Sequence, residues 1–351
     1  MKKAVSILTA ACLALSLAAC SSDSPSSAAA DPSSTSDASE SSSAETAEDT
    51  GTDASAAAYT IGICQQQPHE ALDAATQGFK DALVEAFGED GVTFDEQNAQ
   101  GDSNTCATII NGFVSGGYDL IMANGSSALQ AAAAGTADIP ILGTSVTEYG
   151  VALGIDGFDG TVGGNVSGTS DLAPLDQQAQ MLADFFPADQ YPTVGMLYCS
   201  AEPNSAYQVE QVTSYLTEMG YTVEDYSFSD SNDLATIATN ASTSCDVLYI
   251  PTDNTAASNT EIIQNICLPA GVPIIAGEQG ICSGCGVATL SISYYDLGYA
   301  TGEMAVKVLT GEADISAMPI EYAPNFTKMY NPGNCEALGI TVPDDYVAIE
   351  G

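Results

Sequence analysis

The sequence predicts an α/β protein built from two similar doubly wound lobes, each a parallel sheet covered by helices, with a ligand cleft between them. Two observations lead to this fold class. Short apolar runs typical of buried strands alternate with longer helical patterns along the chain, and the second half of the alternation repeats the first. The 351 residues suffice for two domains with their own cores.

The expected strands are mostly continuous apolar runs, as in parallel sheets that are covered on both faces. They are Tyr59–Cys64, Val92–Asn98, Leu120–Asn124, Ile139–Val146, Val194–Cys199, Thr222–Phe228, Val247–Pro251, Val272–Ala276 and Val287–Ile292. Helical patterns fit between them at Glu70–Phe87, Thr105–Ser115, Ser126–Ala134, Pro174–Phe185, Ala206–Met219, Asn232–Ala241, Ala256–Cys267 and Tyr294–Leu309.

Four short matches relate the two halves. Asp102–Ile109 returns at Asp230–Ile237, Thr60-Ile61-Gly62 at Thr193-Val194-Gly195, Asp119-Leu120-Ile121 at Asp246-Val247-Leu248, and Ile139-Pro140-Ile141 at Val272-Pro273-Ile274, with offsets of 128, 133, 127 and 133 residues. Four matches in the same order at a nearly constant offset indicate two copies of one unit. The break between them is expected near Asn165–Pro174, where glycines and a proline interrupt the pattern.

Ligands of such sheets bind beyond the carboxyl ends of the strands, so polar residues at these ends are the candidate site. Asp253 follows one strand at the start of a helix, and the repeat places Ser126 opposite it. A carboxylate in one lobe suits an ammonium, and hydroxyls with helix amides in the other suit a carboxylate. Together they favour a zwitterion such as an amino acid. The alternative is that both residues are only helix caps.

The proposed ligand contacts follow from this placement. Asp253 and Glu278 are expected to take the ammonium, while Ser126, Ser127 and Thr144 hold the carboxylate without help from Arg, which the chain lacks. Further candidates for the lining are Gln67, Asn98, Asn204, Ser205, Asn254, Thr255 and Tyr294, with Tyr198 and Tyr207 as possible aromatic walls.

Lys2 and Lys3 precede a short apolar run that ends in Leu17-Ala18-Ala19-Cys20, a pattern typical of a secretory signal. The last four residues resemble a bacterial lipobox, which implies cleavage before Cys20 and lipidation of its thiol. An ordinary signal with a chance cysteine is the alternative. Residues 1–19 are thus the expected signal peptide, and residues 20–58, acidic and without aromatics, a disordered tether.

Composition excludes several functions. The 46 acidic residues, against five lysines and no Arg, give a formal charge of −41, which repels nucleic acid. No cofactor or metal is expected, because the chain has a single histidine, His69. Eight cysteines remain after Cys12 and Cys20, and Cys282-Ser283-Gly284-Cys285 is expected in a loop, as structural disulfide or free thiol rather than metal or redox chemistry.

Several motifs resemble the TrpX-like substrate-binding lipoproteins of ABC importers. They are P-H-E-A-L-D-A-A from Pro68, Q-N-A-Q-G-D from Gln97, G-N-V-S-G-T-S-D from Gly164, P-T-D-N-T from Pro251, A-G-E from Ala276 and Y-Y-D-L-G-Y-A-T-G-E-M-A from Tyr294. The resemblance implies the type I periplasmic-binding-protein fold and delivery of ligand to a membrane permease. The protein is expected to be a monomer. Some relatives bind aromatic amino acids. The added cysteines, the lack of Arg and Asn124-Gly125-Ser126-Ser127 depart from the family pattern.

The expected lobes are residues 59–170 plus about 290–315, and residues 171–289 plus about 316–351. The leading function is that of a lipid-anchored receptor on the outer face of the cell membrane, which closes around an amino-acid-like ligand. A sugar or nucleoside receptor and a ligand-sensing co-receptor are the alternatives. An enzyme is not expected, because no G-x-S-x-G, Walker A or H-E-x-x-H motif is present.

Overall fold

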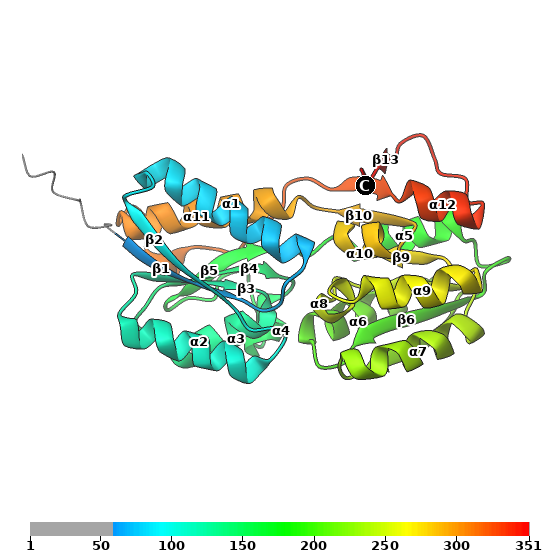
Figure 1. Cartoon of the computed structure of the whole chain (residues 1–351), viewed down its shortest axis with the longest axis horizontal. Coiled ribbons are helices and arrows are strands. Elements are labelled where there is room, and N and C mark those ends of the chain that lie inside the picture. The colour runs from blue at the N-terminus through cyan, green and yellow to red at the C-terminus, as the bar shows by residue number, and fades with distance from the viewer. Residues whose placement is uncertain (1–58, 351) are drawn as a thin grey trace, which may run out of the picture. The chain divides into compact units, whose positions relative to one another are not determined.

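The computed structural model describes residues 59–350, which contain two sheets flanked by helices (Figure 1). The expected signal peptide, Cys12, Cys20 and the tether lie outside the described residues. Within them, no helix is long and apolar enough to cross a membrane.

The first lobe is built on a sheet in the order β11-β5-β4-β3-β1-β2, and all its pairings are parallel. Helices α1 and α11 cover one face, and α2, α3 and α4 the other, each with its own apolar core (Figure 1). The elements are β1 (Tyr59–Gln65), α1 (Glu70–Phe87), β2 (Val92–Asn98), α2 (Ser103–Gly116), β3 (Leu120–Asn124), α3 (Ser126–Gly135), β4 (Ile141–Val146), α4 (Tyr149–Leu153), β5 (Val166–Ser170), α11 (Tyr294–Leu309), η1 (Ile315–Ala317) and β11 (Glu321–Tyr322).

The second lobe has a sheet in the order β13-β12-β10-β9-β8-β6-β7, in which β12 runs antiparallel to β10. One core contains α7, α8, α9 and α10 residues, and the other α5, α6 and α12 residues. The elements are α5 (Leu175–Phe185), β6 (Thr193–Cys199), α6 (Pro203–Glu218), β7 (Thr222–Phe228), α7 (Ser231–Ser244), β8 (Val247–Ile250), α8 (Asn254–Ala257), α9 (Thr260–Ala270), β9 (Ile274–Ala276), α10 (Gln279–Gly284), β10 (Ala288–Ser291), β12 (Thr327–Tyr330), α12 (Pro332–Leu338) and β13 (Val347–Ala348).

The repeat seen in the sequence corresponds to equivalent contacts in the two lobes. In the first, the Thr60 backbone N–H donates to Asp119 Oδ2 at 2.7 Å; in the second, the Thr193 N–H donates to Asp246 Oδ2 at 2.9 Å. Asp102 caps α2 just as Asp230 caps α7. The matched residues therefore have equivalent roles, although Asp102 accepts from the Thr105 N–H and Asp230 from the Asn232 N–H. The prediction of two similar parallel-sheet lobes is confirmed.

Three chain segments connect the lobes: residues 171–174 after β5, residues 292–293 before α11, and residues 323–326 between β11 and β12. The second lobe resumes at β12 rather than at about 316, because β11 pairs with β5 of the first sheet through Glu321 and Tyr322. The expected break at 165–174 contains strand β5, and only its last four residues form the connection.

Other expected elements also differ. The helix predicted over Ala256–Cys267 is two helices, α8 and α9, which are separated by Ser258 and Asn259. The Cys282–Cys285 segment forms helix α10 and its C-cap rather than a loop, because Glu278 accepts hydrogen bonds from the first free amides of that turn.

Helices α1 and α11 approach each other closely, and glycines permit it. A Cβ on Gly78 would overlap the carbonyl oxygen of Tyr295, and one on Gly298 would overlap that of Ala75. Gly112 of α2 differs, because a Cβ there would meet nothing within 4 Å. The α1–α11 pair holds the segment that returns from the second lobe against the first sheet.

Candidate ligand-binding site

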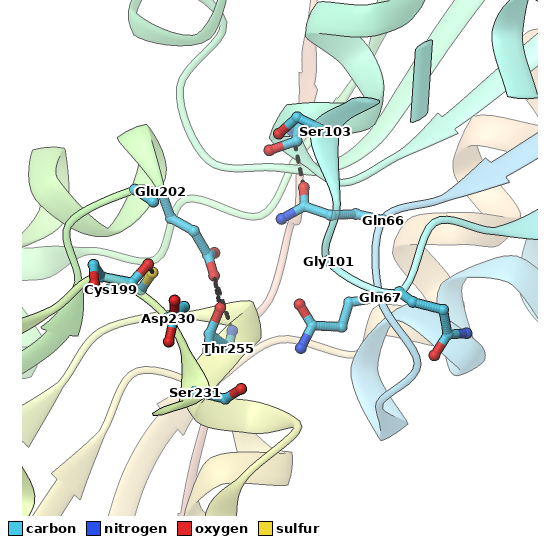
Figure 2. Close-up of a pocket in the computed structure, with 13 residues that line it drawn as sticks. Gln66, Gln67, Gly101, Ser103, Cys199, Glu202, Asp230, Ser231 and Thr255 are labelled. Atoms are coloured by element: carbon cyan, nitrogen blue, oxygen red, sulfur yellow. Dashed lines mark hydrogen bonds between the residues drawn. The ribbon is translucent and has the colours of Figure 1, made fainter. Parts of the chain in front are cut away.

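A cavity of about 200 Å³, partly open to solvent, lies between the loops that follow the strands of both lobes. Figure 2 shows Gln66 and Gln67 of the first lobe on one side and Glu202 and Thr255 of the second on the other. Its lining is polar and consists of Gln66, Gln67, Gln100, Gly101, Ser103, Ser127, Cys199, Ala201, Glu202, Ser229, Asp230, Ser231 and Thr255.

Glu202 organises the second-lobe side of this cavity. It follows β6 and precedes Pro203, the first residue of α6, and it is 5% exposed. Its Oε1 accepts from the Thr255 backbone N–H at 2.9 Å and from the Thr255 hydroxyl at 2.7 Å, and its Oε2 accepts from the Asn254 N–H at 3.0 Å and the Asn254 side-chain amide at 2.6 Å. The carboxylate thus occupies the free amides at the start of α8.

Gln66, which follows β1, bonds a free amide at a helix N-terminus of the first lobe, as Glu202 does in the second. Its Oε1 accepts from the Ser127 backbone N–H at 2.8 Å, and so satisfies an amide in the first turn of α3. The α3 N-cap itself is Gly125, which has no side chain to accept a hydrogen bond from these amides. In both lobes, therefore, a side chain from the loop after the first strand bonds amides at a helix N-terminus, and the one at α3 is the N-terminus that the sequence analysis assigned to the ligand carboxylate.

The lobes contact each other beside the cavity. His69 Nε2 lies 3.0 Å from Asn254 Oδ1, and the Ser258 hydroxyl donates to the Pro68 carbonyl oxygen at 3.1 Å. Because Asn254 donates its amide hydrogens to Glu202, its oxygen faces the ring, and we assign the hydrogen to His69 Nε2. Burial lowers the pKa of His69, and the Asn254 contact and nearby Glu202 and Asp73 offset part of that.

Asp253 is a buried helix cap. Its Oδ1 accepts from the Ala256 backbone N–H at 2.8 Å, and its Oδ2 accepts from the Cys199 N–H at 2.6 Å, so both oxygens are bound within the second lobe. Burial and the neighbouring Glu202 charge raise its pKa to about 7. Asp253 does not line the cavity. Asp253 is therefore the N-cap of α8, whereas Ser126, its counterpart in the sequence repeat, is not a cap, because Gly125 has that position in α3.

Glu278 has a similar position in the third loop of that lobe. It caps α10 through the backbone N–H groups of Gly280 and Ile281, and it is 2% exposed. Burial raises its pKa to about 7. The two carboxylates chosen from the sequence for the ammonium thus already serve backbone amides.

The other predicted contacts divide into two groups. Gln67, Ser127 and Thr255 line the cavity, and Asn254 lies next to it on the bond to His69. The remaining predicted contacts do not line the cavity. Three of them bond within their own lobe: Asn98 accepts from the Gln100 N–H, Asn204 donates to the Thr252 carbonyl, and Thr144 bonds to Thr169. Ser126 and Ser205 are buried, and Tyr294 donates to Asp171.

A family model for ABC transporter substrate binding proteins matches residues 60–349. This chain belongs to that family. A tyrosine-binding protein from Clostridioides difficile (strain R20291) is 35% identical over 280 residues, which is 79% of this chain and 80% of the relative. As a member of the family, this binding protein works outside the cytoplasm, and the prediction of a TrpX-like receptor is confirmed.

Two solved structures are similar to this chain in sequence and fold, and a third is similar in fold alone. An ABC domain in complex with L-Trp from Streptococcus pneumonia is 32% identical, covers 82% of this chain and 96% of its own, and has a TM-score of 0.77. A ligand-free, open substrate binding protein with adhesive properties from Clostridium difficile is 37% identical, with 83% and 100% coverage and a TM-score of 0.63. The leucine binding protein LivK from Thermotoga maritima, 13% identical over 73% of this chain and 84% of its own, with a TM-score of 0.57, shares the type I fold.

A second polar group lies where the connecting segments meet. The Tyr294 hydroxyl, at the start of α11, donates to Asp171 Oδ2 at 2.9 Å, directly after β5. Asp171 is 3% exposed, and its burial raises its pKa, with Thr147 and Tyr294 as partly compensating hydrogen-bond donors. Asp171 Oδ1 and the nearby Ser145 Oγ have no hydrogen-bond partner.

Sequence reasoning missed Gln66, Glu202 and Asp171 in this binding protein. An acidic residue just before a proline that begins a helix, as in Glu202-Pro203, was an available signal. Asp171 follows the hydroxyl-rich Ser167–Ser170 segment, which lacked the apolar run expected of a strand. Gln66 is one of three consecutive glutamines, and the sequence does not tell which of them faces α3.

The cysteines show no arrangement suited to a cofactor. Within residues 59–350, all eight are buried free thiols, and no group of three or more His, Cys, Asp or Glu is placed to hold a metal ion. Burial raises the pKa of Cys282 and Cys285 well above the usual thiol value, which suppresses the reactive thiolate. The sequence left structural disulfides and free thiols open for these cysteines, and the structure contains free thiols.

Proposed function

We propose that this chain is the lipid-anchored receptor of an ABC importer and that it closes its two lobes around a small aromatic amino acid. The observation that carries the proposal is the similarity, over about four fifths of the chain, to a tyrosine-binding protein and to a structure holding L-Trp. The cleft of this chain, lined by loops of both lobes, is the place where such a ligand would be enclosed.

The hydrogen bonds between the lobes support closure as the binding event. His69 and Pro68 of the first lobe contact Asn254 and Ser258 of the second. The chain also superposes better on the L-Trp complex, with a TM-score of 0.77, than on the open ligand-free relative, with 0.63, although the latter is slightly more identical. A ligand that contacts both lobes binds the closed arrangement more tightly than the open one. It shifts the equilibrium toward the closed arrangement by that difference in binding free energy.

Membrane attachment and partner follow from the sequence. Lipidation at Cys20 would hold the receptor at the outer face of the membrane, and the acidic tether would let it reach a permease, to which it delivers the ligand as a monomer. We propose binding and release without a chemical step, so the protein is a receptor rather than an enzyme.

The chain contains no Trp, which makes a direct binding test possible. Full-length protein in detergent is mixed with tryptophan and excited beyond the tyrosine absorption band, so that all fluorescence comes from the ligand. Burial in the cleft should shift that emission to shorter wavelength with a saturable dependence on protein concentration. Tyrosine and phenylalanine should compete, and glutamate, glucose and adenosine serve as comparison solutes.

Calorimetry with the same six solutes checks the fluorescence result without relying on an emission change. Heat from tyrosine, phenylalanine or tryptophan alone supports the proposal. Binding of glucose or adenosine with no heat from any amino acid would replace it by the sugar or nucleoside receptor that the sequence left open.

A further inference from the structure

Two cysteines of the first lobe contact each other in its core. Cys64 lies near the end of β1, and Cys106 is the fourth residue of α2, a helix that packs on that strand. Both side chains are fully buried in the same apolar core, and their thiols are hydrogen-bonded to each other. The two residues are 42 positions apart in the chain, so the fold itself brings them together.

The other cysteines of the described chain differ from this pair. Within residues 59–350, six more are buried, and none of these thiols is hydrogen-bonded to another: Cys199, Cys245, Cys267, Cys282, Cys285 and Cys335. Even Cys282 in α10 and Cys285 at its C-cap, which are close in sequence, are not bonded, because the Cys285 thiol donates to the Ile281 carbonyl oxygen at 3.4 Å instead. Cys64 and Cys106 are therefore a specific pair.

The internal repeat shows what the same contact contains in the second lobe. The offsets of 133 and 128 residues align Cys64 with Leu197 and Cys106 with Leu234. Both leucines are fully buried in one core, on β6 and α7. One lobe thus joins its first strand to the following helix with two apolar side chains, and the other has a thiol at both positions. Two thiols that meet at one contact are the arrangement that a disulfide requires.

The location of the protein favours oxidation of such a pair. Members of this family work outside the cytoplasm, where no reducing thiol pool keeps cysteines reduced and disulfides form and persist. The bond would close a long loop, because Cys64 and Cys106 are far apart in the chain, and long loops give a disulfide its largest effect on the unfolded state.

We infer that Cys64 and Cys106 form a disulfide bond in the exported protein, and that the structure holds this pair in its reduced form. One thiolate attacks a sulfur of a small extracytoplasmic disulfide and displaces a thiol, and the second cysteine then attacks the mixed disulfide and displaces the other. The two cysteines lose two protons and two electrons, and the oxidant becomes two thiols. Because both side chains are buried, the reaction precedes the packing of α2 on β1.

The bond lies directly behind the first-lobe wall of the cleft. Gln66 and Gln67 follow β1, and Gly101 precedes α2, whose first residue is Ser103; all four line the cavity (Figure 2). The Gly101 N–H donates to the Gln66 carbonyl oxygen at 2.9 Å. A covalent link from the end of β1 to the start of α2 keeps these two loops together. It crosses no connection between the lobes, so it leaves closure free.

Digestion after glutamate gives a direct test, because it leaves each of the two cysteines alone in its peptide. Residues 49–70 contain only Cys64, and residues 97–148 contain only Cys106. Full-length protein from the membrane fraction is alkylated with iodoacetamide in denaturant without reductant, digested and measured by mass spectrometry. The two peptides should appear joined, and they should separate into two alkylated peptides only when reductant is added before alkylation.

Thermal unfolding provides a second measurement. Reductant should lower the unfolding midpoint of the full-length protein by several degrees, because it restores the freedom of the unfolded chain. Cys106→Ala should no longer respond to reductant. Cys267→Ala is the matched control: it removes another buried cysteine, one without a thiol partner, and should keep the response of the unmodified protein.

Two results would overturn the inference. Before reduction, both peptides could be found alkylated and separate, which would mean that Cys64 and Cys106 remain thiols in the exported protein. Alternatively, either peptide could be joined to one of the other six cysteines, which would assign the bond to a different pair. Neither result bears on the ligand, because the inference does not use the proposed function.

Discussion

Glu202 has more hydrogen bonds than any other side chain in the cleft, and all its strong donors are neutral groups of Asn254 and Thr255. Four donors within 3.0 Å fill the usual capacity of a carboxylate. The residue therefore positions the loop after β8 and, through Asn254, the contact with His69.

Replacing Glu202 by Ala should lower the free energy of unfolding by about 2–5 kcal/mol, because it leaves two backbone amides and two side-chain donors without their acceptor in a buried site. Glu210→Ala, an exposed acid on the same helix α6, is the control and should change stability by less than about 0.5 kcal/mol. Urea unfolding measures both, and similar losses in the two variants would mean that the Glu202 bonds contribute nothing.

At the scale of elements, the packing of α11 on α1 decides which glycines tolerate a side chain. Gly298→Ala places a methyl group against the Ala75 carbonyl and should destabilise the protein by about 1–3 kcal/mol or more. Gly112→Ala, in the middle of α2 and facing solvent, should instead stabilise it by about 0.5–1 kcal/mol. Thermal unfolding of the two variants should move the midpoint in opposite directions, and equal shifts would refute the close packing.

Elements with a clear apolar pattern could be predicted from the sequence. Helices α1 and α11 and strands β2, β3 and β7 have the expected ends. Strand β5 was missed because its inward side chains are hydroxyls whose bonds come from distant residues: Ser167 donates to the Met318 carbonyl, and Thr169 bonds to Thr301. Helix α10 was missed because its glycines signal a loop, while its cap comes from Glu278.

The candidate site was predicted less well than the elements. Of the residues chosen because they lie at strand ends, three line the cavity: Gln67, Ser127 and Thr255. Position at a strand end could not tell an acid that caps a helix, such as Asp253, from an acid with a free oxygen, such as Asp171. That difference depends on which donors the fold brings within reach, and the sequence does not contain it locally.

Across the whole molecule, buried acids set the response to pH. The pKa of Asp253 and that of Glu278 are raised to about 7, above the usual 3.8 and 4.5. Between those values the folded protein holds protons that the unfolded chain has released, so the free energy of unfolding falls as pH rises toward 7. The lowered pKa of His69 opposes this below its usual value of 6.5, but it is one group against three, because burial raises the pKa of Asp171 as well.

Glu278→Gln keeps an oxygen for the α10 cap but removes the titrating group. The free energy of unfolding should then fall less steeply between pH 5 and pH 7, by at most about 1.4 kcal/mol per pH unit, which is the effect of one proton. Glu261→Gln, exposed in the first turn of α9, is the control and should keep the original slope. Urea unfolding at several pH values measures it, and an unchanged slope in Glu278→Gln would contradict the raised pKa.

The side chains that occupy the helix N-termini at the cleft have a consequence for selectivity. Gln66 fills the amide position at α3, and Glu202 fills that at α8 and adds a negative charge of its own. A second carboxylate or a phosphate on a solute would find the Ser127, Asn254 and Thr255 amides already bonded, and it would meet the like charge of Glu202. We therefore expect charge repulsion to disfavour dicarboxylic amino acids and phosphorylated solutes, and glutamate in the calorimetric comparison should give no heat.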